Sequence, residues 1–473
     1  MCYNPNIVLV TILPDISSGL DQPVTVRSLE AHLRSCVERG LLAAGDRLPP
    51  IREAAWKLGC APGTVARAYR ALELAGLAHG EVGRGTFIAS GDRKLAFPQA
   101  ATRTTQHVAD LAVNSFLIED ASILVGKALA AVQSDLAAGD LPLAYLTTGE
   151  DEDIRGVAAR FLGGQGAARH MDEIVVTAGA QAAIASAFLA LTENGGGIAC
   201  DALTYPGVIS AASAARARLH PVKMDDDGMD PEALDALCRR AKIACVFLMP
   251  STQNPTGRRM SARRCEQLAE VAARHGVVVV EDRIYDFLAD EGTHTGISGF
   301  LPESTVLVTG LSKCVAPILR VGFVAAPKPL ARQILAVENA LSLMVSPLLT
   351  RVAAHILSDG GFEARLARVR RGIAERATIA HELLPQLKPE ALQGGLAWLE
   401  LAGGWSADAF SAEAEALGVR VAPARFFAVE PRGAPEAVRL CLGSVAQDDV
   451  YRRALEDLAS LMARPPRGPQ ILP

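Results

Sequence analysis

The sequence predicts a two-part protein in which a small helical head is followed by a large α/β domain. Three short stretches with apolar residues at helical spacing, ending in a glycine-rich hairpin, occupy residues 24–90. Farther along, apolar runs typical of buried strands alternate with helical stretches, the pattern of a mainly parallel sheet covered on both faces. The length of 473 residues allows two or three domains, and half of the residues are apolar, enough for a large core.

The head begins with TVRSLEAHLRSCVERGLL, a helical pattern that Gly45 and two following prolines end. IREAAWKLG forms a second short helix, CAP a turn, and GTVARAYRALELAGL a third helix that starts near Thr64. The stretch AHGEVGRGTFIAS then supplies two extended runs around a Gly-Arg-Gly tip. Three helices followed by a glycine-tipped hairpin predict a winged helix-turn-helix over residues 24–90.

Charge is distributed unevenly along the chain. Residues 24–88 contain nine basic and six acidic side chains, a net charge of +3, whereas the whole chain carries −5. The remainder therefore carries −8. A basic segment joined to a large acidic body makes the head the candidate for binding a polyanion such as double-stranded DNA.

Composition argues against several classes of protein. Residues 1–23 lack a positively charged region and a small-residue cleavage site, so we interpret them as an N-terminal extension rather than a signal peptide. No apolar run is long enough to span a bilayer, and we expect no membrane association. The nine cysteines are scattered without a C-x-x-C pair, which indicates a reducing cytoplasm and no metal site.

A polar, threonine-rich stretch without periodicity, residues 91–110, is interpreted as a linker between the two parts. The α/β domain then covers residues 111–473. Its alternating strands and helices define a large lobe of about residues 111–345. A helical stretch followed by the strand patterns GGLAWLELAG and AVRLCLGSV indicates a smaller C-terminal lobe, about residues 346–473.

Polar residues follow the expected strands at the points where the strands end. The carboxyl ends of parallel strands meet at one edge of a sheet, where ligands of α/β proteins bind. Any one of these residues has an ordinary explanation, since Asn-Pro-Thr-Gly, for example, is usually only a turn. In chain order the candidates are Ala180 and Gln181 after EIVVTAG, Tyr205 after GGIAC, Asn254 after IACVFLMP, Asp282 and Tyr285 after VVVV, and Ser312, Lys313 and Arg320 after TVLVTG.

Together these residues match the chemistry of pyridoxal 5'-phosphate (PLP). The amine of Lys313 would form an imine with the cofactor aldehyde, and burial and nearby cations favour the neutral amine that this step needs. Asp282 would face the pyridine nitrogen and keep it protonated, which makes the ring an electron sink. Asn254 and Tyr285 can donate hydrogen bonds to the phenolate oxygen of the ring.

The remaining candidates suit the ring and the phosphate. Tyr205 can stack on the ring, and Arg320 offers a planar fork to the phosphate. The backbone N–H groups of Ala180 and Gln181 open a helix, a place that favours an anion.

Residues from about 111 to the end resemble the fold-type I, aminotransferase-like PLP-dependent proteins. The resemblance lies in NPTG, in the Asp-x-x-Tyr of residues 282–285 and in SKCVAPILRVG, which occur in the family's order and spacing. It implies that an arginine of the small lobe, Arg439 in VRLCLG, holds a substrate carboxylate. The family often has a serine where this chain has Gly310, so Ser312 or Thr309 would substitute, or the phosphate would be held by one contact fewer.

Residues 24–90 resemble the winged-helix domain of the GntR family through GLLAAGDRLPPIREAAWKLG, TVARAYRALELAGL and GRGTF. A GntR head joined to an aminotransferase-like domain is similar to the MocR group of bacterial transcriptional regulators. The resemblance implies a cytoplasmic homodimer whose two heads bind the half-sites of a DNA operator.

The recognition helix departs from the pattern of many relatives, which have Ser-Arg where this chain has Ala-Pro-Gly. Pro62 cannot donate a hydrogen bond, so base reading would fall to Thr64 and Arg67. Arg52 is the candidate for a phosphate or base contact, and Arg84 at the wing tip for the minor groove. Each of these arginines could instead be an ordinary solvated cation.

The leading hypothesis is a PLP-dependent transcriptional regulator that senses a small amine or amino acid. The amine would displace Lys313 and form an external aldimine, Arg439 would hold its carboxylate, and lobe closure would shift the heads through the linker. One alternative is an active aminotransferase with an accessory head, in which the released Lys313 acts as a general base. Another is a cofactor-independent repressor whose large domain only dimerises. Turnover of amine to keto acid would favour the first alternative, and absence of visible absorbance with PLP the second.

Overall fold

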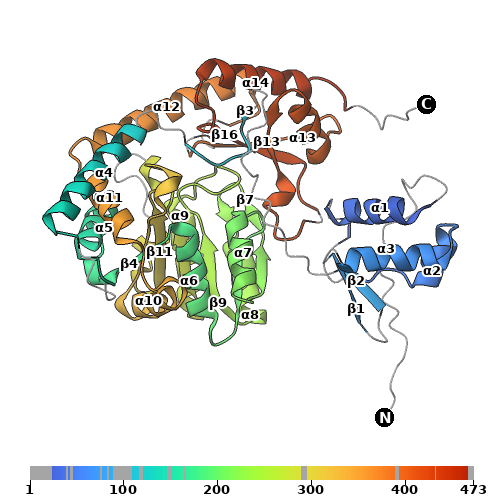
Figure 1. The fold of residues 1–473 in the computed structure, drawn as a ribbon, viewed down its shortest axis with the longest axis horizontal. Helices are drawn as coiled ribbons and strands as arrows, with labels where there is room; N and C mark the ends of the chain where they lie inside the picture. Colours follow the sequence, from blue (N-terminus) through green and yellow to red (C-terminus); the bar gives the residue numbers. More distant parts are fainter. Residues whose placement is uncertain are drawn as a thin grey trace, which may run out of the picture. The chain divides into compact units, whose positions relative to one another are not determined.

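The computed structural model divides the chain into two compact units, a head (Met1–Ala96) and a body (Phe97–Pro473) (Figure 1). The predicted N-terminal extension, most of the predicted linker and Arg84 lie outside the residues that the structure describes. The described residues are 24–38, 41–42, 46–74, 77–81, 85–88, 109–116, 121–141, 143–145, 152–164, 166–288, 296–388, 392, 394–431 and 433–466.

The head has the predicted three helices and hairpin. Its elements are α1 (Val26–Glu38), α2 (Ile51–Lys57), α3 (Pro62–Leu74), β1 (Ala78–Glu81) and β2 (Gly85–Ile88). The two strands are antiparallel, with Ala78 opposite Ile88, and the Leu48 N–H donates to the Thr86 carbonyl at 2.9 Å. That bond ties the connection between α1 and α2 to the hairpin, so the wing is part of one small fold.

The head is held by a core of its own. Leu29, Leu33 and Val65 are fully buried in it, and the hydroxyl of buried Tyr69 donates to the Pro49 carbonyl at 3.0 Å. Helix α3 begins at Pro62, two residues before the predicted start, because proline at the first helical position loses no intrahelical hydrogen bond.

The large lobe of the body contains a seven-stranded sheet in the order β4-β12-β11-β10-β9-β5-β6. Four of its six strand pairs are parallel, as the prediction of a mainly parallel sheet requires. The other two are antiparallel, because β12 runs against both of its neighbours, β4 and β11. The strands are β4 (Ile174–Thr177), β5 (Gly197–Asp201), β6 (Leu219–Val222), β9 (Ile243–Leu248), β10 (Val278–Asp282), β11 (Thr305–Gly310) and β12 (Gly322–Ala325).

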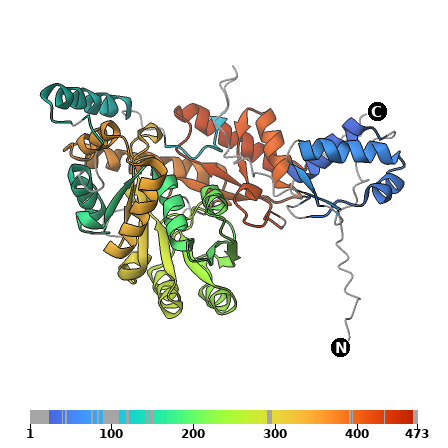
Figure 2. The same ribbon diagram turned by 60° about the horizontal axis from the view of Figure 1, so that its bottom comes forward.

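Helices cover both faces of this sheet (Figures 1 and 2). Along β9, Cys245 and Phe247 belong to the core on one face, and Val246 and Leu248 to the core on the other. All four are buried, which explains the unbroken apolar run in the sequence. The first face carries α6 (Ala180–Thr192), α7 (Pro206–Ala214) and α10 (Lys328–Ser342), and the second carries α8 (Pro231–Arg240) and α9 (Ala262–His275).

The smaller lobe has a core of its own around Phe410, Leu440 and Tyr451. Its three-stranded sheet includes both strands expected from GGLAWLELAG and AVRLCLGSV. The elements are α12 (Phe362–Leu383), β13 (Leu396–Glu400), α13 (Ala407–Ala416), β15 (Ala422–Pro423), β16 (Ala437–Cys441) and α14 (Asp448–Met462).

The predicted linker, residues 91–110, extends two residues too far. Ala109–Asp110 forms strand β3, which pairs in parallel with β14 (Val419–Arg420) of the smaller lobe. The partner strand lies more than 300 residues away along the chain, so local sequence carries no sign of this pairing.

One helix of the described residues, α4 (Ala121–Ala138), is long and apolar enough by length and composition to cross a membrane, with a mean hydropathy of 1.2 over 18 residues. Lys127 and Asp135 lie within this stretch, so it is not an uninterrupted apolar run, although its average hydropathy is high. Asp135 lies 2.8 Å from His355 and 3.8 Å from Arg351, both on α11 (Pro347–Leu357). One side of α4 is therefore tied to the body.

Gly322, the first residue of β12, lies where the loop before α6 crosses the sheet. A Cβ atom there would lie 2.5 Å from the Gly179 carbonyl carbon and 2.7 Å from the Ala180 nitrogen, and both are backbone atoms that cannot swing away. We expect Gly322→Ala to lower the stability of the body by about 1–3 kcal/mol, visible as a lower urea midpoint.

Gly163, on helix α5 (Glu152–Gly164), provides the matched control, because a Cβ there meets nothing within 4 Å. Gly163→Ala should leave the free energy of unfolding unchanged or raise it by up to about 1 kcal/mol, so its urea midpoint should not fall. Equal midpoints for the two variants would contradict the close approach at Gly322.

Candidate functional site

The site is built on the connection between β11 and β12. Strand β11 ends at Gly310, β12 begins at Gly322, and the two residues lie opposite each other in the antiparallel pair. The connecting segment must therefore leave and return at the same edge of the sheet. It carries the predicted residues Ser312, Lys313 and Arg320.

Lys313 is half-buried beside several charged groups. Its Nζ donates a hydrogen bond to the Asn114 carbonyl. Burial lowers the pKa of the Lys313 amine to about 8; Arg439 and Arg320 also lower it, while Asp282 opposes the shift. A lysine of this kind is roughly one-tenth neutral at pH 7, far more than an exposed lysine.

Asp282 ends strand β10 and is buried. Its Oδ1 accepts a hydrogen bond from the Ile284 N–H at 3.0 Å. Burial raises the pKa of the Asp282 carboxyl to about 7, and the nearby Lys313 amine pulls it the other way. A cation placed against the free oxygen of this buried carboxyl would stabilise its ionised form.

Tyr285 and Asn254 complete the side of the site nearest the smaller lobe. Tyr285 is buried, and its hydroxyl accepts from the Asn114 side chain. Asn254 is also buried, and its Oδ1 accepts from the Arg439 Nη1 at 3.1 Å. The edge of the Phe116 ring packs on Tyr285, with ring centroids 6.2 Å apart.

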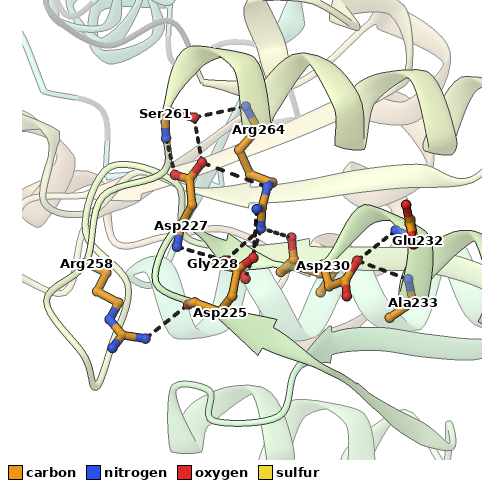
Figure 3. Close-up of polar contacts among 10 residues, drawn as sticks. Asp225, Asp227, Gly228, Asp230, Glu232, Ala233, Arg258, Ser261 and Arg264 are labelled. Atoms are coloured by element: carbon orange, nitrogen blue, oxygen red, sulfur yellow. Dashed lines mark hydrogen bonds and ion pairs between the residues drawn. The ribbon is translucent and has the colours of Figure 1, made fainter.

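A two-stranded hairpin, β7 (Met224–Asp225) and β8 (Gly228–Met229), holds the loop that carries Asn254 (Figure 3). Arg258 donates to the Asp225 carbonyl at 3.0 Å, and Ser261 donates to Asp227 from its backbone and its hydroxyl, both at 2.6 Å. These contacts join the hairpin to the start of helix α9, because Ser261 also caps that helix. The contacts on both sides of the loop fix the position of the Asn254 side-chain amide.

Tyr205 and Gln181 lie side by side at the starts of α7 and α6. Burial raises the pKa of Tyr205 to about 12, and Asp282, Arg320 and Arg439 are its charged neighbours. Gly207 makes room for both side chains, because a Cβ there would lie 2.3 Å from the Tyr205 ring and 2.0 Å from the Gln181 Oε1.

The start of α6 suits an anion. Gly179, in the left-handed region at φ +89°, precedes the helix and offers no side-chain cap. Arg320 lies over it and donates to the Ala178 carbonyl at 3.1 Å. Arg320 is itself left-handed at φ +49°, a strained conformation for a residue with a side chain. The amides of Ala180 and Gln181 open the helix beside this guanidinium.

The backbone around position 310 explains why this chain has glycine there instead of the serine common in the family. A Cβ at this position would lie 3.1 Å from the Val321 carbonyl oxygen and 3.2 Å from the Gly322 Cα. A serine would crowd the backbone where β11 and β12 meet. Ser312 is half-buried beside Lys313, and Thr309 is turned toward the Arg283 carbonyl, to which its hydroxyl donates at 3.4 Å.

Arg439 is a buried cation on β16. Its Nη1 donates to Asn254 and its Nη2 to the Ala112 carbonyl, and its guanidinium lies 4.8 Å from the centroid of the Phe427 ring. Burial lowers the pKa of the guanidinium. No carboxylate of the described residues lies within ion-pair distance of Arg439, so it is suited to a carboxylate from outside.

Three of the four predicted DNA-contacting residues, all except Arg84, lie in the described part of the head. Arg52 is exposed on α2, and Thr64 is half-buried near the start of α3. Arg67 is exposed and its Nε donates to the Gly63 carbonyl at 3.1 Å.

Sequence reasoning missed the contributions of Ala112 and Asn114. Both act at least in part through backbone carbonyls, which leave no trace in residue type. It also missed Asp201, which ends β5, is buried, and has its pKa raised to about 7 by burial, with Gln253 as hydrogen-bond partner at 3.3 Å. The only signal for Asp201 was its position after an apolar strand.

Comparison with known proteins matches both parts. Residues 106–458 match the family model for aminotransferase class I and II, and residues 25–88 that for bacterial regulatory proteins of the gntR family. The HTH-type transcriptional regulator YdeF of Bacillus subtilis is 28% identical over 447 residues, which cover 91% of this chain and 94% of YdeF.

Two further relatives resemble different aspects of the chain. The vitamin B6 salvage pathway transcriptional repressor PtsJ of Salmonella typhimurium is 28% identical over 405 residues, covering 84% of this chain and 91% of PtsJ. The crystal structure of LysN, an α-aminoadipate aminotransferase from Thermus thermophilus in complex with N-(5'-phosphopyridoxyl)-L-leucine, superimposes with a TM-score of 0.67 at 24% identity. It covers 76% of this chain and 92% of LysN, and shows the fold. The chain therefore belongs to the aminotransferase class I and II family, in the MocR group that joins this domain to a gntR-type head.

Proposed function

We propose that this protein is a PLP-dependent transcriptional regulator that binds operator DNA through its head and captures a small amine or amino acid in its body. The observation that carries the proposal is the pair of Lys313, with its lowered pKa, and Asp282, with its raised pKa. This pair lies in a chain that also has a winged helix-turn-helix.

The residues present fit PLP on three counts. Buried Asp282 suits a protonated ring nitrogen. The uncapped start of α6 beside Arg320 suits a phosphate dianion. Gln181 Oε1 is buried without a hydrogen-bond partner among the described residues, and it lies next to Tyr205. The proposed holders are Lys313, Asp282, Tyr285, Asn254, Tyr205, Arg320, Ser312 and the amides of Ala180 and Gln181.

When bound, PLP supplies the covalent capture of primary amines and an electron sink. Lys313 is the proposed attachment point, and burial, helped by the neighbouring arginines, keeps part of its amine neutral. Asp282 holds a proton at the ring nitrogen. Tyr285 and Asn254 donate hydrogen bonds to the ring oxygen, and Tyr205 covers the ring.

Arg439 is the proposed anchor for the carboxylate of an amino-acid ligand. Its buried guanidinium has the Phe427 ring on one face and Asn254 at one end, so the fork is held in a fixed direction. A ligand without a carboxylate leaves this cation uncompensated and binds less tightly.

The head supplies the proposed contacts with double-stranded DNA. Arg52 and Arg67 are exposed cations on the two helices of the helix-turn-helix, and Thr64 lies near the start of the recognition helix. Arg84 of the wing tip is the further proposed contact. A regulator that binds the chromosome works in the cytoplasm.

An exposed apolar face on and after α4 supports a homodimer. Leu143 and Tyr145 are 91% and 77% exposed, and Ile123 and Leu129 on α4 are more than half exposed. Side chains of this size are covered by protein in most stable folds. A second copy is the proposed cover, and a monomeric mass in light scattering at micromolar concentration would contradict it.

The alternative of a working aminotransferase draws on the same residues, since Lys313, once released, lies where it can move a proton. The two functions differ in turnover. Keto acid released at ordinary enzyme rates, about 1 s⁻¹ or faster, would favour the enzyme.

Covalent labelling tests the role of Lys313. Incubation with PLP followed by borohydride reduction should place the added mass on Lys313, as mapped by peptide mass spectrometry. The extent of labelling should rise as pH is raised through about 8, because only the neutral amine reacts. An exposed lysine, with an ordinary pKa of about 10.4, would respond at higher pH.

Asp282→Asn provides the electrostatic control. Asp282 raises the pKa of Lys313, so its neutralisation should move the labelling midpoint to lower pH. Label found on other lysines, or a midpoint that stays at the value of an exposed lysine, would refute the proposed attachment.

DNA binding tests the regulator as a whole. A duplex selected by the full-length protein from a random pool should bind with a dissociation constant that changes on addition of PLP and one of the proteinogenic L-amino acids, as measured by fluorescence anisotropy. Arg52→Ala and Arg67→Ala should weaken binding, and for a phosphate contact the salt slope should fall by about 1.

Arg453→Ala is the matched control, because Arg453 is an exposed arginine of the body, paired with Asp449 on α14. It should leave DNA affinity unchanged. Affinity that ignores every amino acid at saturating PLP would refute sensing, whereas undiminished affinity in both head variants would refute the assigned DNA contacts.

A further inference from the structure

The first described segment of the body, residues 109–116, joins the smaller lobe to the candidate site; we refer to it as the strap. On the lobe side, Asp110 forms an ion pair with Arg420 at 2.8 Å, and the Cys441 N–H donates to the Leu111 carbonyl at 2.8 Å. The Ser444 hydroxyl donates to the Asp110 carbonyl at 2.6 Å. These bonds add to the pairing of β3 with β14.

On the other side, the strap contacts three residues proposed to hold cofactor or ligand. The Ala112 carbonyl accepts from Arg439, and the Asn114 carbonyl accepts from Lys313. The Asn114 side chain donates to the Tyr285 hydroxyl. Its Oδ1 is buried and has no hydrogen-bond partner among the described residues.

The shape of the strap depends on Asp110. The Asp110 Oδ1 accepts from the N–H groups of Ala112 and Val113 at 3.0 and 3.2 Å, which closes a tight turn. That turn directs the carbonyls of Ala112 and Asn114 toward the site. Because Asp110 also pairs with Arg420, the turn is fixed to the smaller lobe.

We propose that the strap reports the occupancy of the site to the DNA-binding head, with Asn114 as its positioning residue. The inference rests on the proposed function, in which Lys313 attaches PLP and Arg439 holds a carboxylate. In chain order the strap is the described part of the body nearest to the head, which makes it the proposed route of the signal.

Both proposed binding events remove a hydrogen bond from the strap. Condensation of the Lys313 amine with an aldehyde forms a carbon–nitrogen double bond, releases water and leaves at most one hydrogen on the nitrogen. The Asn114 carbonyl then loses its ammonium donor. A carboxylate on the Arg439 fork competes with the Ala112 carbonyl, and a charged acceptor forms the stronger hydrogen bond.

The strap therefore has two states that ligands distinguish. With the site empty of ligand, Arg439 and Lys313 hold it in place. An amine that displaces Lys313 from the cofactor returns the lysine as a free amine, so the ligand acts on the strap through its carboxylate, which takes Arg439 from the Ala112 carbonyl. The released state is favoured only by the difference in affinity that the ligand has for the two states. A compound that fills the ring and phosphate positions without a carboxylate leaves the contact of Ala112 with Arg439 intact.

Hydrogen–deuterium exchange of the full-length protein with two probes tests this difference. Pyridoxamine 5'-phosphate and N-(5'-phosphopyridoxyl)-L-leucine share the ring and phosphate, but only the leucine compound brings a carboxylate. Backbone amides of residues 109–116 should exchange about fivefold faster with the leucine compound, the effect of one lost hydrogen bond. Equal or slower exchange would overturn the inference.

Two truncations on the strap test its coupling to DNA. Asn114→Ala removes the contact with Tyr285, whereas Val113→Ala shortens the half-buried neighbouring side chain, for which no such contact is seen. The ratio of DNA dissociation constants measured with the two probes should fall toward one in Asn114→Ala and stay at the wild-type value in Val113→Ala. A wild-type ratio in Asn114→Ala would overturn the role of Asn114. A change that only destabilises the protein would not alter this ratio, so the ratio separates the two effects.

Failure of the strap is distinguishable from failure of the proposed function. If neither probe raises the melting temperature of the protein, the body does not bind the cofactor, and both the proposed function and the proposed role of the strap are wrong. If both probes bind and the exchange of residues 109–116 does not respond, the strap inference alone is wrong.

Discussion

Strand β12 runs against both of its neighbours, and this reversal is what brings Lys313 and Arg320 to the edge of the sheet where β10 delivers Asp282. The close backbone approach needs glycines at 310 and 322, because any Cβ there meets backbone within 3.2 Å. The left-handed conformation of Arg320 follows from the same tight return. The backbone path thus determines which side chains meet at this edge of the sheet.

Desolvation then adjusts the charges that this geometry brings together. Burial lowers the pKa of Lys313 and raises that of Asp282, so both groups move toward their neutral forms near pH 7 to 8. Arg439 stays a cation in spite of burial, and the Phe427 ring and the Asn254 amide partly replace its lost water. The result is a cluster that brings together a partly neutral amine, a carboxyl and a fixed cation.

The strands could be predicted because buried parallel strands are continuous apolar runs, and the candidate site residues were chosen because they follow such runs. Lys313, Asp282 and Asn254 were proposed in this way. Strand β12 and the strap were not, because a short antiparallel return and contacts made by backbone carbonyls leave little mark on residue type. The exposed apolar face of α4 was missed for the opposite reason: two charges hid a high average hydropathy.

The pairing of β3 with β14 has a consequence for how the protein is made. Asp110 and Arg420 are 310 residues apart, and at about 5–20 residues per second a ribosome needs about 15–60 seconds to add that stretch. Among the described residues, the core of the head is formed by side chains between Val24 and Ile88. A nascent chain therefore presents a finished winged domain well before the body has the strand that anchors it.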